Sequence, residues 1–461
     1  MNPLAKPAPY RVTIIHPCVG RHVGMRGYIR TWLMEPLPAA TVAALLPADV
    51  ERRFYDDRLE AIPFAEPTDL VLISVETYTA RRAYQIASDY RRRGVPVVMG
   101  GFHAALCPDE VGRYADSVVI GEAEAQLPTV IDDWRHGRGK RIYRALNRPS
   151  LVKVRPDRTI LAGKKYLPIS LVETARGCRF RCEFCAITTV FKATQSRRPI
   201  DLVLDELRAA KRPGRLIFLI DDNVVSDIAA AKELFRAMAP LGLRWVGQAS
   251  SDVARDDEAL ALMKASGCVG VLVGFESLEA DDLKKMNKGF NLQGGGPPAA
   301  MANFRRHGLR IYGTFVIGYD HDTEAAVQRR VAFARDEGMF IAAFNHLTPF
   351  PGTPLYHRLE KEGRLTSPAW WLDPAYRYND VPYRPAGMSA DEIRRLCLEA
   401  RRSFYSWSSI AQRARQRVHW RDPWMWINFL VINVMHRRDV DGRDGLPLGD
   451  AAWTGELLEV T

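Results

Sequence analysis

The sequence is poor in cysteine and has no long apolar run. Seven cysteines in 461 residues are too few for a disulfide framework. No stretch reaches the ~18 apolar residues that a membrane-spanning helix needs. The start, MNPLAKPAPYRVTIIHP, lacks the apolar core and small-residue cleavage site of a secretory signal. With 47% hydrophobic and 26% charged residues, the composition predicts a cytoplasmic protein of two or three domains.

Positive charge is in excess, but there is no long basic arm. The net charge is +11, from 65 Lys+Arg against 54 Asp+Glu, and the arginines are spread over stretches such as RRRGVP and RARQRVHWRD. A well-solvated, arginine-rich surface is the simplest interpretation. Attraction to an anionic membrane or a phosphate-bearing substrate is the alternative, and no nucleic-acid partner is expected.

The first domain, assigned to residues 1–135, alternates short apolar runs with helical stretches. Five strands are predicted, at 11–17, 50–57, 69–76, 96–101 and 116–122. This alternation predicts a doubly wound, Rossmann-like parallel sheet, in which ligands bind outside the carboxyl ends of the strands. Those ends are polar or contain glycine, which lets the backbone approach a ligand, although ordinary turns are the alternative. They read HPCVG (16–20), SVETYT (74–79), GGFH (100–103) and GEAE (121–124).

Three further segments follow. Residues 136–168 are basic and contain proline, which predicts a linker with room for one hairpin. In residues 169–370, six β/α units predict a partial (β/α)6 TIM-type barrel whose polar strand ends face one mouth. Residues 371–461 are predicted to be helical, with a capping signal at Ser389 and a glycine-rich polar tail. The barrel strands are predicted at 169–175, 215–221, 243–250, 268–277, 310–320 and 340–350.

Cys178, Cys182 and Cys185 lie within eight positions, just after the first barrel strand and the glycine of ARGC. A tight loop there could point three thiolates at one centre. Four thiolates would complete a zinc or iron–sulfur site, whereas three leave one iron of a cubane open to a small molecule. Zinc with a distant fourth ligand is the alternative.

The C-x3-C-x2-C spacing, with the aromatic Phe184 before the third cysteine, resembles the radical S-adenosylmethionine (SAM) superfamily. The resemblance implies a [4Fe–4S] cluster whose open iron chelates the amino and carboxylate groups of SAM. It further implies reductive cleavage of SAM to a 5′-deoxyadenosyl radical, which abstracts hydrogen from an unactivated carbon. An electron donor such as flavodoxin or ferredoxin is then expected.

Later stretches are similar to the strand ends of that superfamily. They are FLIDDNVVSD after the second strand, VGQASSD after the third, VGFESLEADDLKKMNK after the fourth, TFVIGYDHDTEA at the fifth and LTPFPGTPLYHRLEKEGRL at the sixth. Their carboxylates and amides suit the ammonium group and ribose hydroxyls of SAM. The candidate SAM contacts are Phe184, Asp221, Asp222, Asn223, Gln248, Ser250 and Glu276.

The amino-terminal segment resembles the cobalamin-binding domain that precedes the barrel in one large subfamily. Matching pieces include DLVLISVETYTARRAYQIA, RRRGVPVVMGGFHAALCPDE and ADSVVIGEAEAQLP, so the resemblance covers roughly residues 10–370. The D-x-H-x-x-G motif, whose histidine ligates cobalt in other cobalamin enzymes, is absent, as is common in the subfamily. Base-off cobalamin is therefore expected, without cobalt ligation by His103. The implied cobalamin contacts are Ser74, Glu76, Thr77, Gly100, Gly101, His103, Gly121, Glu122 and Glu124.

Several reactions remain open at this point. Methyl transfer from methylcobalamin to a substrate carbon ranks first, and radical cyclisation, carbon–carbon coupling or oxidation without net methylation is the alternative. A non-catalytic corrinoid- or cluster-binding sensor is a third hypothesis. The methylthiotransferases, which share the barrel, need three more cysteines in the first domain, where this chain has Cys18 and Cys107.

Residues 417–439 (RVHWRDPWMWINFLVINVMHRRD) are aromatic and apolar with basic flanks. One interpretation is a helix packed on the barrel. The other is an interfacial helix that serves a hydrophobic or lipid-like substrate at the inner membrane face. The twelve residues Trp424–Met435 are too few to span a bilayer.

Overall fold

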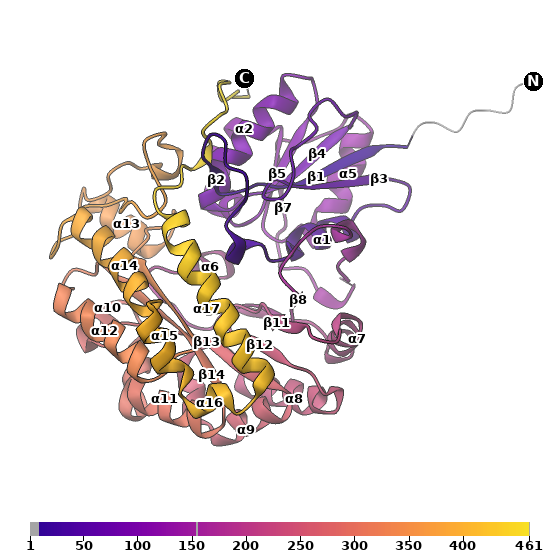
Figure 1. Cartoon of the computed structure of the whole chain (residues 1–461). Helices are drawn as coiled ribbons and strands as arrows, with labels where there is room; N and C mark the ends of the chain where they lie inside the picture. Colours follow the sequence, from indigo (N-terminus) through magenta and orange to yellow (C-terminus); the bar gives the residue numbers. More distant parts are fainter. Residues whose placement is uncertain (1–8, 154, 461) are drawn as a thin grey trace, which may run out of the picture.

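The computed structural model, which describes residues 9–153 and 155–460, contains two parallel β-sheets that follow one another along the chain (Figure 1). A set of carboxyl-terminal helices packs beside the second sheet. The first eight residues, which belong to the stretch considered for a secretory signal, lie outside the described residues. Among the helices of the described part, none combines the length and the apolar character needed to cross a membrane.

The first sheet has six parallel strands in the order β3-β1-β4-β5-β6-β7, which confirms the doubly wound prediction. Neighbouring residues of β1 point to opposite faces. Ile14 packs beneath α1 (Leu37–Ala44) and α5 (Leu127–Arg135), while Ile15 packs beneath α2 (Ala80–Arg91) and α4 (Pro108–Tyr114). The strands are β1 (Arg11–His16), β3 (Glu51–Asp56), β4 (Leu70–Ser74), β5 (Val97–Gly100), β6 (Ser117–Ile120) and β7 (Ile142–Arg144).

Strand β7 corrects the prediction for residues 136–168. This segment was expected to be a linker with room for a hairpin, but Ile142–Arg144 pairs in parallel with β6 and adds a sixth strand to the first sheet. Its sequence signal is weak because the strand has three residues, of which Tyr143 alone is buried.

The second sheet is an open, partial barrel of six parallel strands in the order β8-β11-β12-β13-β14-β15, as predicted. Residues of β14 alternate between two environments. Ile311, Phe315 and Ile317 are buried in the core beneath the helices, whereas Tyr312 and Thr314 are half-buried on the inner face of the barrel. The strands are β8 (Ile169–Val172), β11 (Leu216–Leu219), β12 (Trp245–Ala249), β13 (Cys268–Glu276), β14 (Arg310–Ile317) and β15 (Ile341–His346). Covering helices include α7 (Ile200–Ala210), α8 (Ile228–Met238), α9 (Asp257–Ala265), α11 (Gly296–Arg306) and α12 (Glu324–Asp336).

The carboxyl-terminal region is helical, as predicted, and starts at a capping box formed by Ser389 and Glu392. It contains α14 (Ala390–Phe404), α15 (Trp407–Ala414), α16 (Arg417–Trp420) and α17 (Pro423–Arg443). Near the end of α17, Asp439 accepts a hydrogen bond of 2.8 Å from the backbone N–H of Thr31 in the first domain. The chain then returns to that domain, where β16 (Gly449–Asp450) pairs with β2 (Gly20–Arg21). The end of the chain therefore ties the two domains together.

Candidate functional site

A cavity lies at the carboxyl ends of the first sheet, on the side that faces the barrel. Its volume is about 300 Å³, and it is open to solvent on one side. Strand ends of the first sheet line one side, and Glu173, Arg176 and Asp222 of the second domain line the other. The ligand-binding edges of both sheets therefore border the same space, as expected for parallel sheets whose ligands bind at the strand ends.

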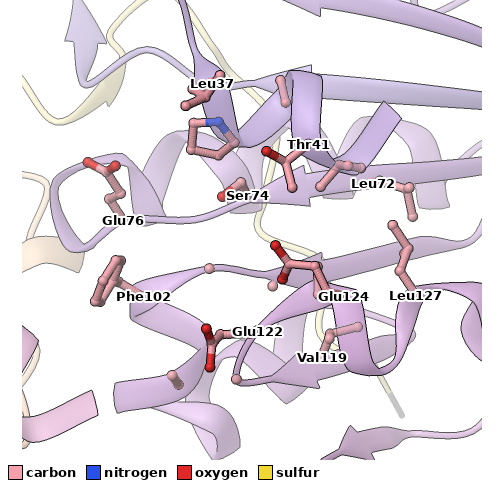
Figure 2. Close-up of a pocket in the computed structure, with 18 of the residues that line it drawn as sticks. Leu37, Thr41, Leu72, Ser74, Glu76, Phe102, Val119, Glu122, Glu124 and Leu127 are labelled. Carbon is pink, nitrogen blue, oxygen red and sulfur yellow. The ribbon is translucent and has the colours of Figure 1, made fainter. Parts of the chain in front are cut away.

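The deep part of the cavity is an apolar groove between helices α1 and α5. Leu37 and Thr41 of α1 lie on one side of it, and Val119 and Leu127 lie on the other (Figure 2). Leu72 lies on the sheet between them. These residues were not predicted from the sequence. Apolar residues that line a ligand groove show the same spacing along the chain as those in an ordinary core.

Seven of the nine predicted cobalamin contacts line the cavity, and two do not. Gly101 has φ of 97°, and a Cβ there would lie 2.8 Å from the carbonyl oxygen of Val75, so the backbone conformation requires glycine. The seven residues are Ser74, Glu76, Gly100, Gly101, Gly121, Glu122 and Glu124.

Thr77 and His103 are the exceptions, because neither lines the cavity. Both are buried, and His103 Nδ1 lies 3.2 Å from Thr77 Oγ1 while its Nε2 lies 3.0 Å from Glu110 Oε1. The ring of Trp371 packs edge-on against the imidazole. His103 is therefore held inside the first domain, away from the cavity lining.

Glu76 projects a carboxyl group into the cavity (Figure 2). Its side chain is accessible from the cavity itself, although protein surrounds it. This enclosure raises the pKa of Glu76, and the nearby Arg58 lowers it in part.

Arg176 joins the domains at the cavity edge. Its guanidinium lies 2.6 Å from Glu124 and 3.4 Å from Glu122 of the first domain, and 2.7 Å from Glu173 of its own domain. Although burial disfavours its charge, Glu173 and Glu124 raise the pKa of Arg176 above the usual range. Arg148 adds a second ion pair to Glu122 at 2.8 Å. Glu122 and Glu124 therefore have an interdomain role that sequence reasoning did not predict.

The three clustered cysteines lie in the loop between β9 (Ala175–Gly177) and α6 (Ala186–Phe191). Gly177 has φ of 96°, and a Cβ there would lie 2.0 Å from the carbonyl oxygen of Thr194, so the tight turn expected from ARGC is present. Burial raises the pKa of Cys182 to about 12; Lys288 lowers it, whereas Cys185 and Cys178 raise it further. The three thiols are thus close enough to influence one another's ionisation.

The donor set consists of three thiols on one short loop. In the part of the chain that the structure describes, no group of three His, Cys, Asp or Glu side chains is placed to hold a single metal ion. A [4Fe–4S] cube binds each thiolate at a different iron, so three thiolates leave one iron open. The residues of the loop suit such a cluster.

Some of the predicted SAM contacts lie beside the cysteine loop, whereas others already have partners within the protein. Asn223 donates to Ser250 Oγ at 3.0 Å and its Nδ2 lies 3.6 Å from Cys178 Sγ, so both residues lie beside the cysteine loop. Glu276, at φ of 64°, forms an ion pair of 2.8 Å with Lys288 at the mouth of the barrel. Lys288, which ends the quoted MNK stretch, was not singled out from the sequence.

The two aspartates after β11 have different roles. Asp221 is buried and accepts hydrogen bonds from the backbone N–H and the hydroxyl of Thr174, so its carboxylate already has partners within the protein. Burial raises its pKa to about 7. Asp222 accepts from the backbone N–H of Gly177 at 2.7 Å and lines the cavity, where burial raises its pKa to about 6.

The remaining SAM candidates, Phe184 and Gln248, are partly buried. Phe184 packs against the barrel core, and the backbone carbonyl of Gln248 accepts from the N–H of Val224 at 2.9 Å. Their contact with SAM stays a prediction.

The fold and site define a two-domain protein with a thiolate loop at the mouth of a partial barrel and a cavity beside it, bordered by both domains. The family model of the radical SAM superfamily matches residues 172–333. Bacteriochlorophyllide d C-12(1)-methyltransferase of Chlorobaculum tepidum is 32% identical over 410 residues, which cover 86% of this chain and 88% of that protein. The chain belongs to the radical SAM superfamily and is a radical SAM enzyme, so a non-catalytic sensor is excluded.

Two further similarities extend over most of the chain. Bacteriochlorophyllide d C-8(2)-methyltransferase of the same organism is 29% identical over 341 residues, which cover 70% of this chain and 74% of that protein. The radical SAM methyltransferase TsrM from Kitasatospora setae, solved with cobalamin and a [4Fe–4S] cluster, has a TM-score of 0.61 at 18% identity, and the match covers 77% of this chain and 75% of that one. The arrangement of a doubly wound sheet before a partial barrel is therefore shared with TsrM.

Proposed function

We propose that the protein is a cobalamin-dependent radical SAM methyltransferase that methylates a carbon atom of a bulky, largely apolar substrate. The cavity bordered by both domains carries this proposal, because it places the strand ends of the first sheet opposite Arg176 and Phe191, which flank the thiolate loop. When bound, the cluster with SAM supplies a radical that removes hydrogen, and cobalamin supplies the methyl group. An external electron donor such as flavodoxin or ferredoxin completes the system.

The residues of the cavity fit cobalamin in two ways. The apolar groove between α1 and α5, lined by Leu37, Leu72, Val119 and Leu127, suits the aromatic base at the end of the nucleotide tail. The backbone at Gly100, Gly101 and Gly121 can approach the edge of a corrin ring closely, because no side chain intervenes. Ser74 and the carboxyl group of Glu76 can hydrogen-bond the amide groups of the ring.

The chain's own residues also keep the reaction space closed. Arg176 and Arg148 bridge the domains through Glu122 and Glu124, which limits entry of water between the two cofactor sites. The Asn223–Ser250 pair and the Glu276–Lys288 ion pair present polar groups around the barrel mouth to hold and orient SAM. A water-poor site protects a reactive radical from side reactions.

The relatives favour a tetrapyrrole as the first substrate to test. Both methyltransferases of Chlorobaculum tepidum act on bacteriochlorophyllide d, at two different positions. The inner face of the barrel here offers Tyr312, Thr314 and Val316, all half-buried, as a mixed wall for a flat and mainly apolar molecule.

The test uses SAM with a fully deuterated methyl group and anaerobically reconstituted protein. With cobalamin and a reductant, a bacteriochlorophyllide acceptor should gain a methyl group that keeps its three deuterium atoms. Omission of cobalamin should abolish the product but leave SAM cleavage. A cyclised or oxidised product without deuterium would refute methyl transfer and identify the alternative radical reaction.

We also propose a peripheral contact with an anionic membrane through the C-terminal aromatic face. This face comprises five exposed side chains on the neighbouring helices α15, α16 and α17 (Figure 1). Residues 407–438 contain six arginines and one carboxylate, Asp422. The members of the face are Trp407, Trp420, Trp426, Ile427 and Val431.

Unpaired positive charge accompanies this face. Arg415, Arg417, Arg421 and Arg438 are exposed, and none has a carboxylate within ion-pair distance among residues 9–153 and 155–460. Met425 and Phe429 of the same helix are buried instead, with Phe429 stacked on His419. One side of α17 therefore packs on the protein, as the first interpretation of segment 417–439 predicted. The exposed side supports the proposed membrane contact.

A further inference from the structure

His16 occupies a central place in the cavity. It is the last residue of β1 and lines the cavity beside the end of β4. The chain order reverses between these two strands, since β1 pairs with β3 on one side and β4 on the other. In doubly wound sheets this switch point is where ligands bind.

The imidazole of His16 has no hydrogen-bond partner among the residues that the structure describes. The two carboxylates next to it are already occupied. Asp56 accepts from Arg58 at 2.7 and 2.9 Å, and Asp57 accepts from Arg82 at 2.8 and 2.9 Å. The side chain of His16 is partly exposed on the cavity wall, so an imidazole nitrogen without a protein partner is free to bind a ligand placed there.

An imidazole without a hydrogen-bond partner keeps a lone pair available on one ring nitrogen, and this is the atom that binds metal ions.

We propose that His16 supplies an axial nitrogen ligand to the cobalt of cobalamin from the side of the first sheet. This inference rests on the proposed function, since it requires cobalamin in the cavity. The base of the nucleotide tail then lies in the apolar groove between α1 and α5 and is not bound to cobalt. The arrangement differs from the D-x-H-x-x-G motif, because His16 lies on the strand itself and no carboxylate is free to orient it.

Electron paramagnetic resonance of the cobalt(II) form tests this assignment in the full-length protein loaded with hydroxocobalamin and reduced. An axial nitrogen splits the cobalt lines into triplets. In uniformly ¹⁵N-labelled protein the triplets should become doublets, because the ligand nitrogen belongs to the protein. In His16→Ala the splitting should vanish while cobalamin stays bound. His22→Ala, which removes an exposed histidine of the first domain that does not line the cavity, should keep the splitting of the wild type.

Two results would overturn the inference. Lines without nitrogen splitting in the wild type would show that no histidine is bound. Triplets that persist in ¹⁵N-labelled protein would show that the ligand is the base of cobalamin itself. If His16→Ala loses cobalamin, the labelled wild type still decides the question. Failure of the wild type to retain any cobalamin would instead refute the proposed function, and this inference with it.

Discussion

The C-terminal aromatic face gives the sharpest test of a membrane contact. The variant Trp426→Ser/Ile427→Ser/Val431→Ser removes three side chains of α17 that are 37%, 58% and 52% exposed. Complete burial of a large apolar side chain contributes roughly 1.5–3 kcal/mol. About half of each side chain remains to be buried by lipid, so each contributes about 1 kcal/mol. The triple variant should therefore bind vesicles roughly 100-fold more weakly, since ~1.4 kcal/mol corresponds to a factor of ten.

Cosedimentation with vesicles of phosphatidylcholine and phosphatidylserine at low salt measures this change. The exposed arginines add about 1 kcal/mol each near an anionic surface, so binding should also weaken with salt and be lost on neutral vesicles. Leu146→Ser/Val152→Ser is the matched control, because it removes two exposed apolar side chains outside the carboxyl-terminal helices. It should bind vesicles as the wild type does.

The choice of residues matters because α17 has a buried side. Phe429 is fully buried, and Arg244 lies over the ring of Trp424, so serine at these positions would disturb packing. A retained cluster in the triple variant confirms that it is folded. The membrane contact is refuted if wild-type protein stays in the supernatant at low salt, or if the folded variant sediments with vesicles as well as the wild type.

Most strands of both sheets could be predicted because they are short apolar runs followed by a turn residue; β3 (ERRFYD), which was also predicted, is largely charged. The exception, β7, buries one residue, Tyr143, and so shows no periodicity. The edge on which the ligand sites lie could be predicted as well, because all strands of a parallel sheet end on the same side. The thiolate loop was visible from its spacing alone.

Side-chain direction at the strand ends could not be predicted. His103, in the strand end GGFH, was predicted as a cobalamin contact, whereas His16, in the strand end HPCVG, was not. In the structure His103 turns inward to Thr77 and Glu110, while His16 faces the cavity. Glu122 and Glu124 posed the same difficulty, because their partner Arg176 lies about fifty residues away in the other domain. Such pairings depend on how the domains meet, which local sequence does not contain.

Two further predictions concern the cluster and the stability of the barrel. Replacement of Cys178, Cys182 and Cys185 by alanine should remove the ~400 nm absorption of the reconstituted protein and all SAM cleavage, and a variant that keeps a full cluster would contradict the assignment. Burial lowers the pKa values of His346, His419 and His436 to about 3, below the unfolded value of 6.5. Below pH 6.5 the unfolded chain therefore takes up protons that the folded protein does not, and stability falls as the pH falls, by up to about 1.4 kcal/mol per pH unit for each histidine. In His419→Gln the unfolded chain should take up one proton fewer. The free energy of unfolding, measured with urea, should therefore differ less between pH 6.5 and pH 5 than in the wild type. If the free energy of unfolding of the variant falls between these two pH values by as much as that of the wild type, His419 is protonated in the folded protein as well.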